Sequence, residues 1–261
     1  MHRSTVFSSL ALTALAVACV CTPAAAQPSG LDAYVVTTFH FIDGNGQHHP
    51  SQVCASDSGA CSSAMPYAQA QGTVVYGAAD GSTAVSSIGR DGAGSGSVDL
   101  HWWDSFTITS DVLPYGTPVT VHMELDMTAA VAPSMFAPSP YTRVQAGLTY
   151  GGRDGPGMVF TSTQSGFSLH STGNLTQVVG QEFSLWGNLL MFTDTNFAIP
   201  GDAGSAAGSA VWRIDVLEAG AGYSTASGHN YASAVPEPAS GATLASGLAV
   251  LAWLLRKRRR D

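Results

Sequence analysis

Lysine is almost absent from this chain of 261 residues, and the single one, Lys257, lies near the C-terminus. Residues 27–234, which we expect to form the mature body, contain four arginines against sixteen aspartates and glutamates. Their net charge is therefore −12 with histidine neutral. Nucleic-acid binding depends on neutralising phosphates, so this body repels nucleic acid, and it repels anionic lipid headgroups too. It is compatible with a hydrated extracellular matrix and with divalent cations.

Helical periodicity and nucleophile motifs are missing from the same residues. No segment has a convincing apolar stripe at helical spacing. No Gly-x-Ser-x-Gly elbow stands between a strand and a helix, and glutamate occurs only at Glu124, Glu182 and Glu218. We therefore expect no enzymatic activity, and a hydrolase with an unrecognised site is the least favoured interpretation.

Strand-like alternation is what the body has instead. In residues 119–127 the apolar side chains alternate with Thr, His, Glu and Asp, which is typical of a half-buried strand. Residues 210–216 alternate in the same way, with Trp212, Ile214 and Val216 inward. Further strands are expected at 33–42, 72–76, 98–109, 142–150, 158–163, 166–170, 175–179 and 182–193.

Turn chemistry separates these segments, at Asp43-Gly44, Asp80-Gly81, Asp91-Gly92, Asp154-Gly155 and Gly201-Asp202. Regularly spaced strands with such turns indicate a sandwich or a barrel. About 208 residues without a linker-like break fit one domain. We expect an all-β fold, a single jelly-roll-like β-sandwich of about ten strands.

The N-terminus predicts export. A short positive start, a mostly apolar stretch from Val6 to Val20 and the pattern Ala24-Ala25-Ala26 make residues 1–26 a signal peptide, with a mature start at Gln27. A weak lipidation box ending at Cys19 is the alternative, although the usual Leu three residues earlier is missing.

Two cysteines remain in the exported body, Cys54 and Cys61. An even pair that is close in sequence usually bridges in an oxidising compartment, so we expect a disulfide. Metal ligation is the alternative, but it needs two further soft ligands, and none stands at zinc-like spacing.

The last 27 residues contain three successive parts. Residues 235–239 are a short motif of Val235, Pro236, Glu237, Pro238 and Ala239, residues 241–255 are an apolar run, and residues 256–260 are Arg256, Lys257, Arg258, Arg259 and Arg260. Fifteen residues are a marginal transmembrane helix, since about 20 are needed to span a bilayer core. The basic cluster keeps the end of the chain cytoplasmic.

This order of motif, apolar run and basic stop resembles the PEP-CTERM sorting signal of exported proteins of Gram-negative bacteria. The resemblance implies that residues 235–261 are read by exosortase, a membrane-embedded cysteine transpeptidase. The protein would be held in the inner membrane transiently and then reach the cell surface or the extracellular space. A plain C-terminal anchor is the alternative.

Two body segments are similar to PEP-CTERM proteins more loosely. Residues 97–109 contain the pattern Asp-x-Phe-Thr-Ile from Asp104 to Ile108, followed by a Gly-x-Pro turn and a long alternating strand. Residues 224–231, Ser-Thr-Ala-Ser-Gly-His-Asn-Tyr, resemble the ends of many such bodies. The resemblance implies a β-sandwich scaffold and transfers no catalytic residue.

Metal sites are weakly indicated. His40, Asp43, His48 and His49 lie within ten residues, but adjacent histidines point to opposite faces of an extended chain, so a turn is favoured over a metal site. The pairs Asp43-x-Asn45 and Asp194-x-Asn196 offer oxygen ligands for calcium, and Asx turns are favoured over it. We expect no cofactor, while a structural calcium elsewhere stays open.

Two further patterns bear on catalysis and binding. Glu124 and Asp126 share a strand face at a spacing that suits inverting glycosidases, but such a pair is usually the solvent face of a strand. Of Trp102 and Trp103, one is expected inward and one outward, while Trp186 and Trp212 fit the core. An outward Trp near Tyr115 or Tyr141 suggests sugar stacking, and packing under loops is the favoured alternative.

Together these patterns predict an exported protein of the cell surface or extracellular matrix, associated with exopolysaccharide, with a structural or interaction role. The alternative is a lectin-like carbohydrate-binding module delivered by the same tail. Expected partners are exosortase, the membrane before processing, and extracellular polysaccharide.

Overall fold

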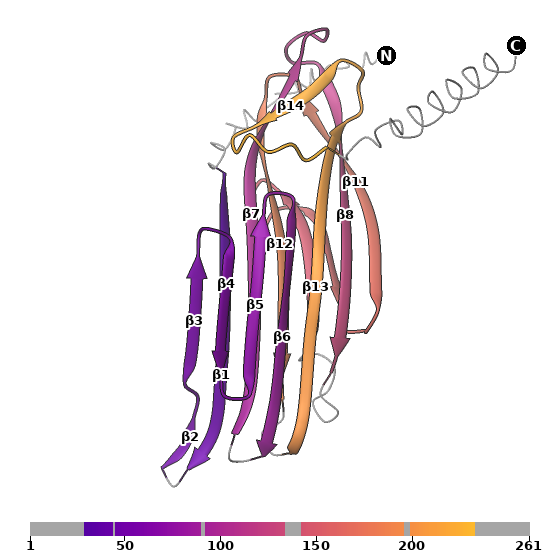
Figure 1. Cartoon of the computed structure of the whole chain (residues 1–261). Coiled ribbons are helices and arrows are strands. Elements are labelled where there is room, and N and C mark those ends of the chain that lie inside the picture. The colour runs from indigo at the N-terminus through magenta and orange to yellow at the C-terminus, as the bar shows by residue number, and fades with distance from the viewer. Residues whose placement is uncertain (1–28, 44, 90–91, 134–141, 196–198, 233–261) are drawn as a thin grey trace, which may run out of the picture.

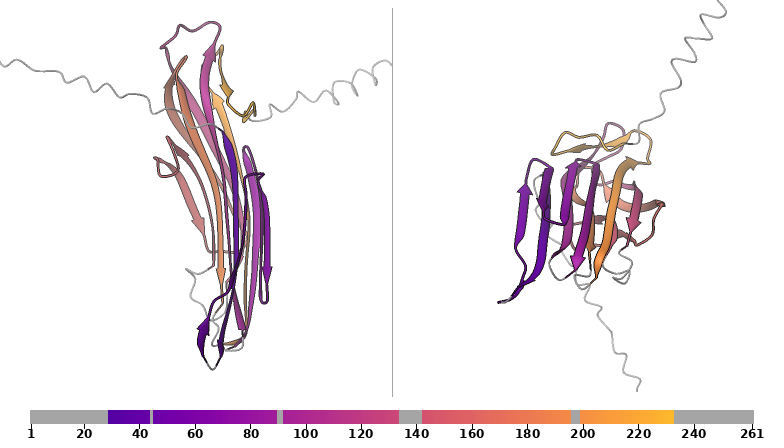
Figure 2. Two further views of the ribbon diagram at one scale, coloured as in Figure 1. Left: turned by 90° about the vertical axis from the view of Figure 1, so that its left-hand side faces the viewer. Right: turned by 60° about the horizontal axis from the view of Figure 1, so that its bottom comes forward.

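The computed structural model describes residues 29–43, 45–89, 92–133, 142–195 and 199–232, so the predicted signal peptide and sorting tail lie outside the described residues. The described part is all β and contains fourteen strands and no helix. The strands of the described part pair in antiparallel fashion. The long strands run along the length of a narrow molecule (Figures 1 and 2).

Sheet I has the order β3-β1-β7-β12-β9-β10, and β14 pairs with β7 beyond the end of β1. Its strands are β1 Gly30–Asp43, β3 Ser51–Ser56, β7 Gly92–Ser110, β9 Arg143–Tyr150, β10 Gly157–Ser162, β12 Glu182–Asp194 and β14 Ala221–Thr225.

Sheet II has the order β4-β5-β6-β13-β8-β11. Its strands are β4 Ala60–Met65, β5 Ala68–Val75, β6 Ala78–Gly89, β8 Pro118–Ala132, β11 Phe167–Val178 and β13 Pro200–Val216, while β2 Gly46–His48 forms a hairpin with the end of β1. The connection from β6 to β7 passes from one sheet to the other, with Ser87 paired to Ala93 and Gly89 to Gly92 across a register shift, so the ladder is nearly closed.

The two sheets pack through the alternate residues of each strand. In β8 the expected apolar positions are buried, from Val119 to Met127, as are Trp212 and Ile214 in β13. Contacts cross between the sheets: Trp102 meets Trp212 with ring centroids 5.7 Å apart, and the Trp212 Nε1–H donates to the Gly147 carbonyl at 2.9 Å. The described body is therefore the predicted β-sandwich.

The expected turn at Asp80-Gly81 is wrong, because both residues lie inside β6. A Cβ on Gly81 would come within 2.4 Å of the Met191 side chain of the other sheet. This glycine thus permits close packing between sheets and does not mark a turn. Gly201-Asp202 likewise falls within β13, beside a register shift after Pro200.

Other differences concern strand number. The expected strands at 166–170 and 175–179 are one continuous strand, β11. No strand was expected at β2, β3, β4, β6, β14 or the first half of β13, most of which are rich in Ala, Ser and Gly. Their side chains are too small to make apolar alternation visible. The expected turn at Asp154-Gly155 does connect β9 to β10. β1 ends at Asp43 and β2 begins at Gly46, which agrees with the turn expected there, and Gly44 lies outside the described residues.

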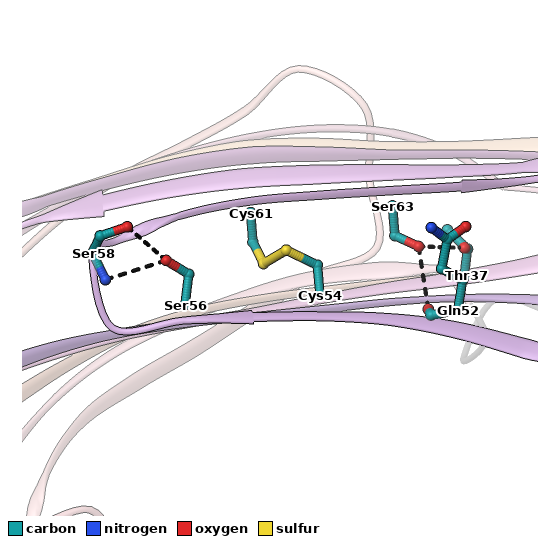
Figure 3. The surroundings of a disulfide bond; sticks show 7 residues. All are labelled: Thr37, Gln52, Cys54, Ser56, Ser58, Cys61 and Ser63. Carbon is teal, nitrogen blue, oxygen red and sulfur yellow. Dashed lines mark hydrogen bonds between the residues drawn. A yellow bond between two sulfur atoms is a disulfide. The ribbon is translucent and has the colours of Figure 1, made fainter.

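A disulfide joins Cys54 of β3 to Cys61 of β4, as the sequence predicts. It links sheet I to sheet II at the edge where the chain passes between them (Figure 3). Nearby, the hydroxyls of Thr37 and Ser63 lie 2.7 Å apart and make a second bond between the sheets. This edge is therefore held both covalently and by a buried hydrogen bond.

Replacing Cys54 and Cys61 together by serine is expected to lower the free energy of unfolding by about 2–3 kcal/mol, because the unfolded chain is no longer cross-linked. Urea unfolding measures the change. Ser56→Ala is the control, since it removes only the two exposed hydrogen bonds between Ser56 and Ser58 at the same corner and should cost about 1 kcal/mol or less. Two alkylatable thiols in protein from the periplasm would contradict the bridge.

Candidate functional site

An aromatic pair lies on the outer face of sheet I. Trp103 of β7 and Trp186 of β12 are direct cross-strand partners, and their rings stack with centroids 4.9 Å apart. Both side chains are half-buried. Trp102 is fully buried on the inner face, so the expected division of Trp102 and Trp103 is confirmed, whereas the core position expected for Trp186 is wrong.

Hydrogen-bonding groups adjoin this pair on the same face of β7. The carboxylate of Asp99 lies 2.6 Å from His101 Nε2, and the Arg153 guanidinium donates to Asp99 at 3.2 Å. Arg153 comes from the β9–β10 loop, whose Gly152 carbonyl accepts a hydrogen bond from the Thr149 hydroxyl. The turn at Asp154-Gly155 therefore places the Arg153 guanidinium on the outer face of sheet I.

His101 is 4% exposed although it points to the outer face. Within the described residues, its Nδ1 and the Trp186 Nε1 are buried without a hydrogen-bond partner. Strand register places Asn188 and Asp32 beside His101 on either side. The outer-face site of Trp103, Trp186, Asp99, His101 and Arg153 thus combines apolar ring surface with donors and acceptors, which is how a hydroxyl-rich ligand is recognised.

Of the two tyrosines expected beside an outward tryptophan, only Tyr115 is described, and it lies elsewhere. Tyr115 is 84% exposed on the β7–β8 loop, where its ring lies over Gly180, so the ring that accompanies Trp103 is Trp186. Tyr141 lies outside the described residues.

Glu124 and Asp126 share the outer face of β8, as the alternation predicts. The Arg213 guanidinium contacts both carboxylates, at 3.5 Å from Glu124 and at shorter range from Asp126. His170 lies 2.7 Å from Asp126, and His122 lies 3.5 Å from Glu124. The pair is part of an ion-pair network across β13, β8 and β11, which favours the solvent-face interpretation.

The His-rich segment forms the tip of the β1–β2 hairpin. Asp43 accepts hydrogen bonds from the Asn45 backbone N–H at 2.7 Å and pairs with His48 Nε2 at 2.9 Å, which lowers the pKa of its carboxyl. This is the Asx-turn geometry. His40 Nδ1 lies 2.6 Å from His49 Nδ1, and partial burial, aided by His49 and opposed by Asp194, lowers the pKa of His40.

Burial raises the pKa of Asp194, while its Oδ1 accepts the Thr195 backbone N–H at 2.9 Å. Asn196, its expected partner in a calcium loop, lies outside the described residues. Among the described residues, no group of three or more His, Cys, Asp or Glu is arranged to hold a metal ion.

The sorting motif at 235–239, the apolar run at 241–255 and the basic cluster at 256–260 all lie outside the described residues. In the part that the structure describes, no helix is long and apolar enough to cross a membrane. The sorting signal therefore stays a prediction.

Comparison with known proteins adds little. No protein-family model matches the chain, and no curated protein matches it. Among solved structures, "Structure of infectious bursal disease virus Gx strain" is similar over 80% of this chain and 63% of that chain, with 8% identity and a TM-score of 0.22. A score this low carries no conclusion about fold or function.

Sequence reasoning missed the contribution of Arg153 and the pairing of Trp103 with Trp186. Only the strand register, which places β7 next to β12, makes the two tryptophans neighbours. Asp99 and His101 stand four and two residues before Trp103 in one strand, and this spacing was the available signal that they share its face.

Asp126 provides a pH-dependent test of the ion-pair network. Partial burial alone would raise the pKa of Asp126, but the hydrogen bonds from His170 and Arg213 outweigh it and hold the pKa below 3.8. The ionised carboxylate thus stabilises the fold above the unfolded pKa, and this stabilisation is lost as the pH falls through the lower folded pKa.

Asp126→Asn is expected to cost about 1 kcal/mol or less near neutral pH, as exposed ion pairs do. The difference from wild type should shrink as the pH is lowered below 3.8. Urea unfolding across this range measures it. The control is Asp80→Asn, a carboxylate on the same sheet face that accepts a bond from Thr73. A difference that does not change with pH would contradict the assignment.

Proposed function

We propose that this chain is an exported protein whose tail is processed by an exosortase-like transpeptidase and whose body is deposited at the cell surface or in extracellular polysaccharide. The observation that carries the proposal is the order of the Pro236-Glu237-Pro238 motif, the apolar run and the basic stop at the end of the chain. The Cys54–Cys61 disulfide supports an oxidising compartment.

The body suits a structural or interaction role. Its strands form nested pairs, with β9–β10 innermost, then β8–β11, then β7–β12, then β6–β13, and this nesting supports a jelly-roll arrangement of the sandwich. The disulfide holds one edge of the sandwich closed. A net charge of −12 on residues 27–234 favours a hydrated, acidic surface over binding to nucleic acid.

Glu237→Ala is expected to leave unprocessed protein in the membrane, because an enzyme makes specific contacts only with the polar motif, whereas the apolar run offers mainly length and hydrophobicity. Leu254→Ile, which preserves that hydrophobicity, is the matched control and should be processed normally. Both are compared in membrane and extracellular fractions of a host with exosortase. Release of Glu237→Ala at the wild-type level would indicate a plain anchor.

A second candidate function is carbohydrate binding at the outer-face site. The specific observation is the half-buried Trp103–Trp186 stack beside His101, whose Nδ1 has no partner among the described residues. Since the body is strongly acidic, a neutral polysaccharide is favoured over an anionic one.

Replacing Trp103 and Trp186 together by alanine should weaken binding to a neutral polysaccharide about tenfold or more, because aromatic side chains dominate such contacts. Retardation in native gels that contain galactomannan or hydroxyethylcellulose measures binding. Tyr115→Ala, which removes an exposed aromatic ring from the β7–β8 loop, is the control. Equal retardation of the double variant and wild type would eliminate this site.

A further inference from the structure

The last described residues, 226–232, form a segment that we call the strap. It follows β14 and crosses from sheet I to sheet II. The Ala226 N–H donates to the Ser105 carbonyl of β7 at 2.9 Å, and the Ile214 N–H of β13 donates to the Tyr231 carbonyl at 3.0 Å. In Figure 1 this yellow part of the chain lies across the upper end of the sandwich.

The strap is bonded to one buried carboxylate, Asp104 of β7, which is 0% exposed. Asp104 Oδ1 accepts the backbone N–H groups of Ser105 at 2.9 Å and of Ser227 at 3.1 Å. Asp104 Oδ2 accepts the Ser227 hydroxyl at short range and the Tyr231 hydroxyl at 3.1 Å. Three of these four donors belong to the strap.

An ionised carboxylate is a pure acceptor with about four lone-pair sites, so four donors match its capacity. A buried charge is costly unless it is hydrogen-bonded in this way. Asp104 shares the buried face of β7 with Trp102 and Phe106. Water could therefore reach the carboxylate only if the strap moved away. The carboxylate and the strap therefore require each other.

Tyr231 anchors the end of the strap in the core. It is 2% exposed, and its ring lies 4.9 Å from that of Trp102 and 5.1 Å from that of Phe106. Burial, with the Asp104 carboxylate, raises the pKa of Tyr231, so its hydroxyl stays a donor. The Tyr231 N–H donates to the Tyr223 hydroxyl at 2.8 Å, which links the strap back to β14.

The strap is also ordered internally. The Ser227 hydroxyl accepts the His229 N–H at 3.1 Å, the Thr225 hydroxyl donates to the His229 carbonyl at 2.8 Å, and Asn230 accepts the Ala232 N–H at 3.0 Å. Opening it would therefore break bonds within the segment as well as those to Asp104.

We propose that Asp104 locks the strap so that the body stays folded to within three residues of the sorting motif, which confines cleavage to that motif. This inference rests on the proposed function. With the strap closed, residues 233–240 alone join the body to the apolar run, a reach of about 28 Å at most. With it open, residues 226–240 would allow about 50 Å and expose the strap to other proteases.

The first experiment is chymotrypsin digestion of the full-length precursor, purified in detergent from cells without exosortase. Cleavage after Tyr115, which is 84% exposed, serves as the internal reference, and cleavage after Tyr231 reports strap opening. In Asp104→Ala, cleavage after Tyr231 should accelerate about tenfold or more, because buried donors lose their acceptor, while cleavage after Tyr115 should not change.

Ser227→Ala keeps Asp104 and removes one hydroxyl donor, so a smaller acceleration is expected. If Asp104→Ala does not fold, the rate of cleavage after Tyr231 in Ser227→Ala tests the lock in its place. Asp80→Ala, on the outer face of sheet II, is the control and should behave as wild type. The lock is refuted if Ser227→Ala and wild type are cut after Tyr231 at equal rates, or if wild type is cut there as fast as after Tyr115.

The second experiment measures the C-terminal masses of protein released by a host with exosortase. Wild type should give one C-terminus at the sorting motif, and Asp104→Ala a mixture with ends upstream of Val235. A single, wild-type end in Asp104→Ala would overturn the role of the strap. Wild type that is never processed, but resists cleavage after Tyr231, would refute the sorting function and leave the lock intact.

Discussion

The contact between Trp102 of β7 and Trp212 of β13 lies where three parts of the molecule meet. Each ring belongs to a different sheet, and the Tyr231 ring from the C-terminal segment packs on Trp102. Neither sheet can bury its apolar face alone, so burial of these large rings favours the closed sandwich over separate sheets. Because Asp104 lies two residues after Trp102 on the same face of β7, this contact also sets the place where the strap is bound.

Small residues make this packing possible. Glycines on the inner faces stand opposite large side chains of the other sheet or of neighbouring strands: a Cβ on Gly187 would come within 2.0 Å of Trp102, and one on Gly208 within 2.5 Å of Val144. The Gly-, Ala- and Ser-rich strands therefore pack against strands that carry large side chains. Their composition, which resembles that of loops, follows from the limited space between two sheets that carry tryptophan and methionine.

The polar residues on the outer faces of the two sheets differ in how completely they are paired. On sheet II, Arg213 is shared by Glu124 and Asp126, so these charges largely satisfy one another. On sheet I, Arg153 pairs with Asp99 while His101 keeps a ring nitrogen without a partner among the described residues. This difference is why the outer face of sheet I, and not the carboxylate pair, is the binding candidate. The role proposed for the strap is separate from ligand binding, because it concerns how close the folded body extends to the sorting motif.

The class of fold, the disulfide and the faces of the long alternating strands could all be predicted from local sequence patterns. Period-2 alternation at residues 119–127 and two cysteines close in sequence are local signals, so they can be recognised without knowing which strands are neighbours. The tail motif was likewise visible only in the sequence, since residues 233–261 lie outside the described part.

The strands of small residues, the outward position of Trp186 and the partners of Asp104 became visible only in the folded structure. Each depends on which strands become neighbours: Gly81 needs Met191 opposite it, Trp186 needs Trp103 beside it, and Asp104 needs a segment 123 residues further along the chain. Local patterns contain no information about such pairings, because register and sheet order are set by packing of the whole chain.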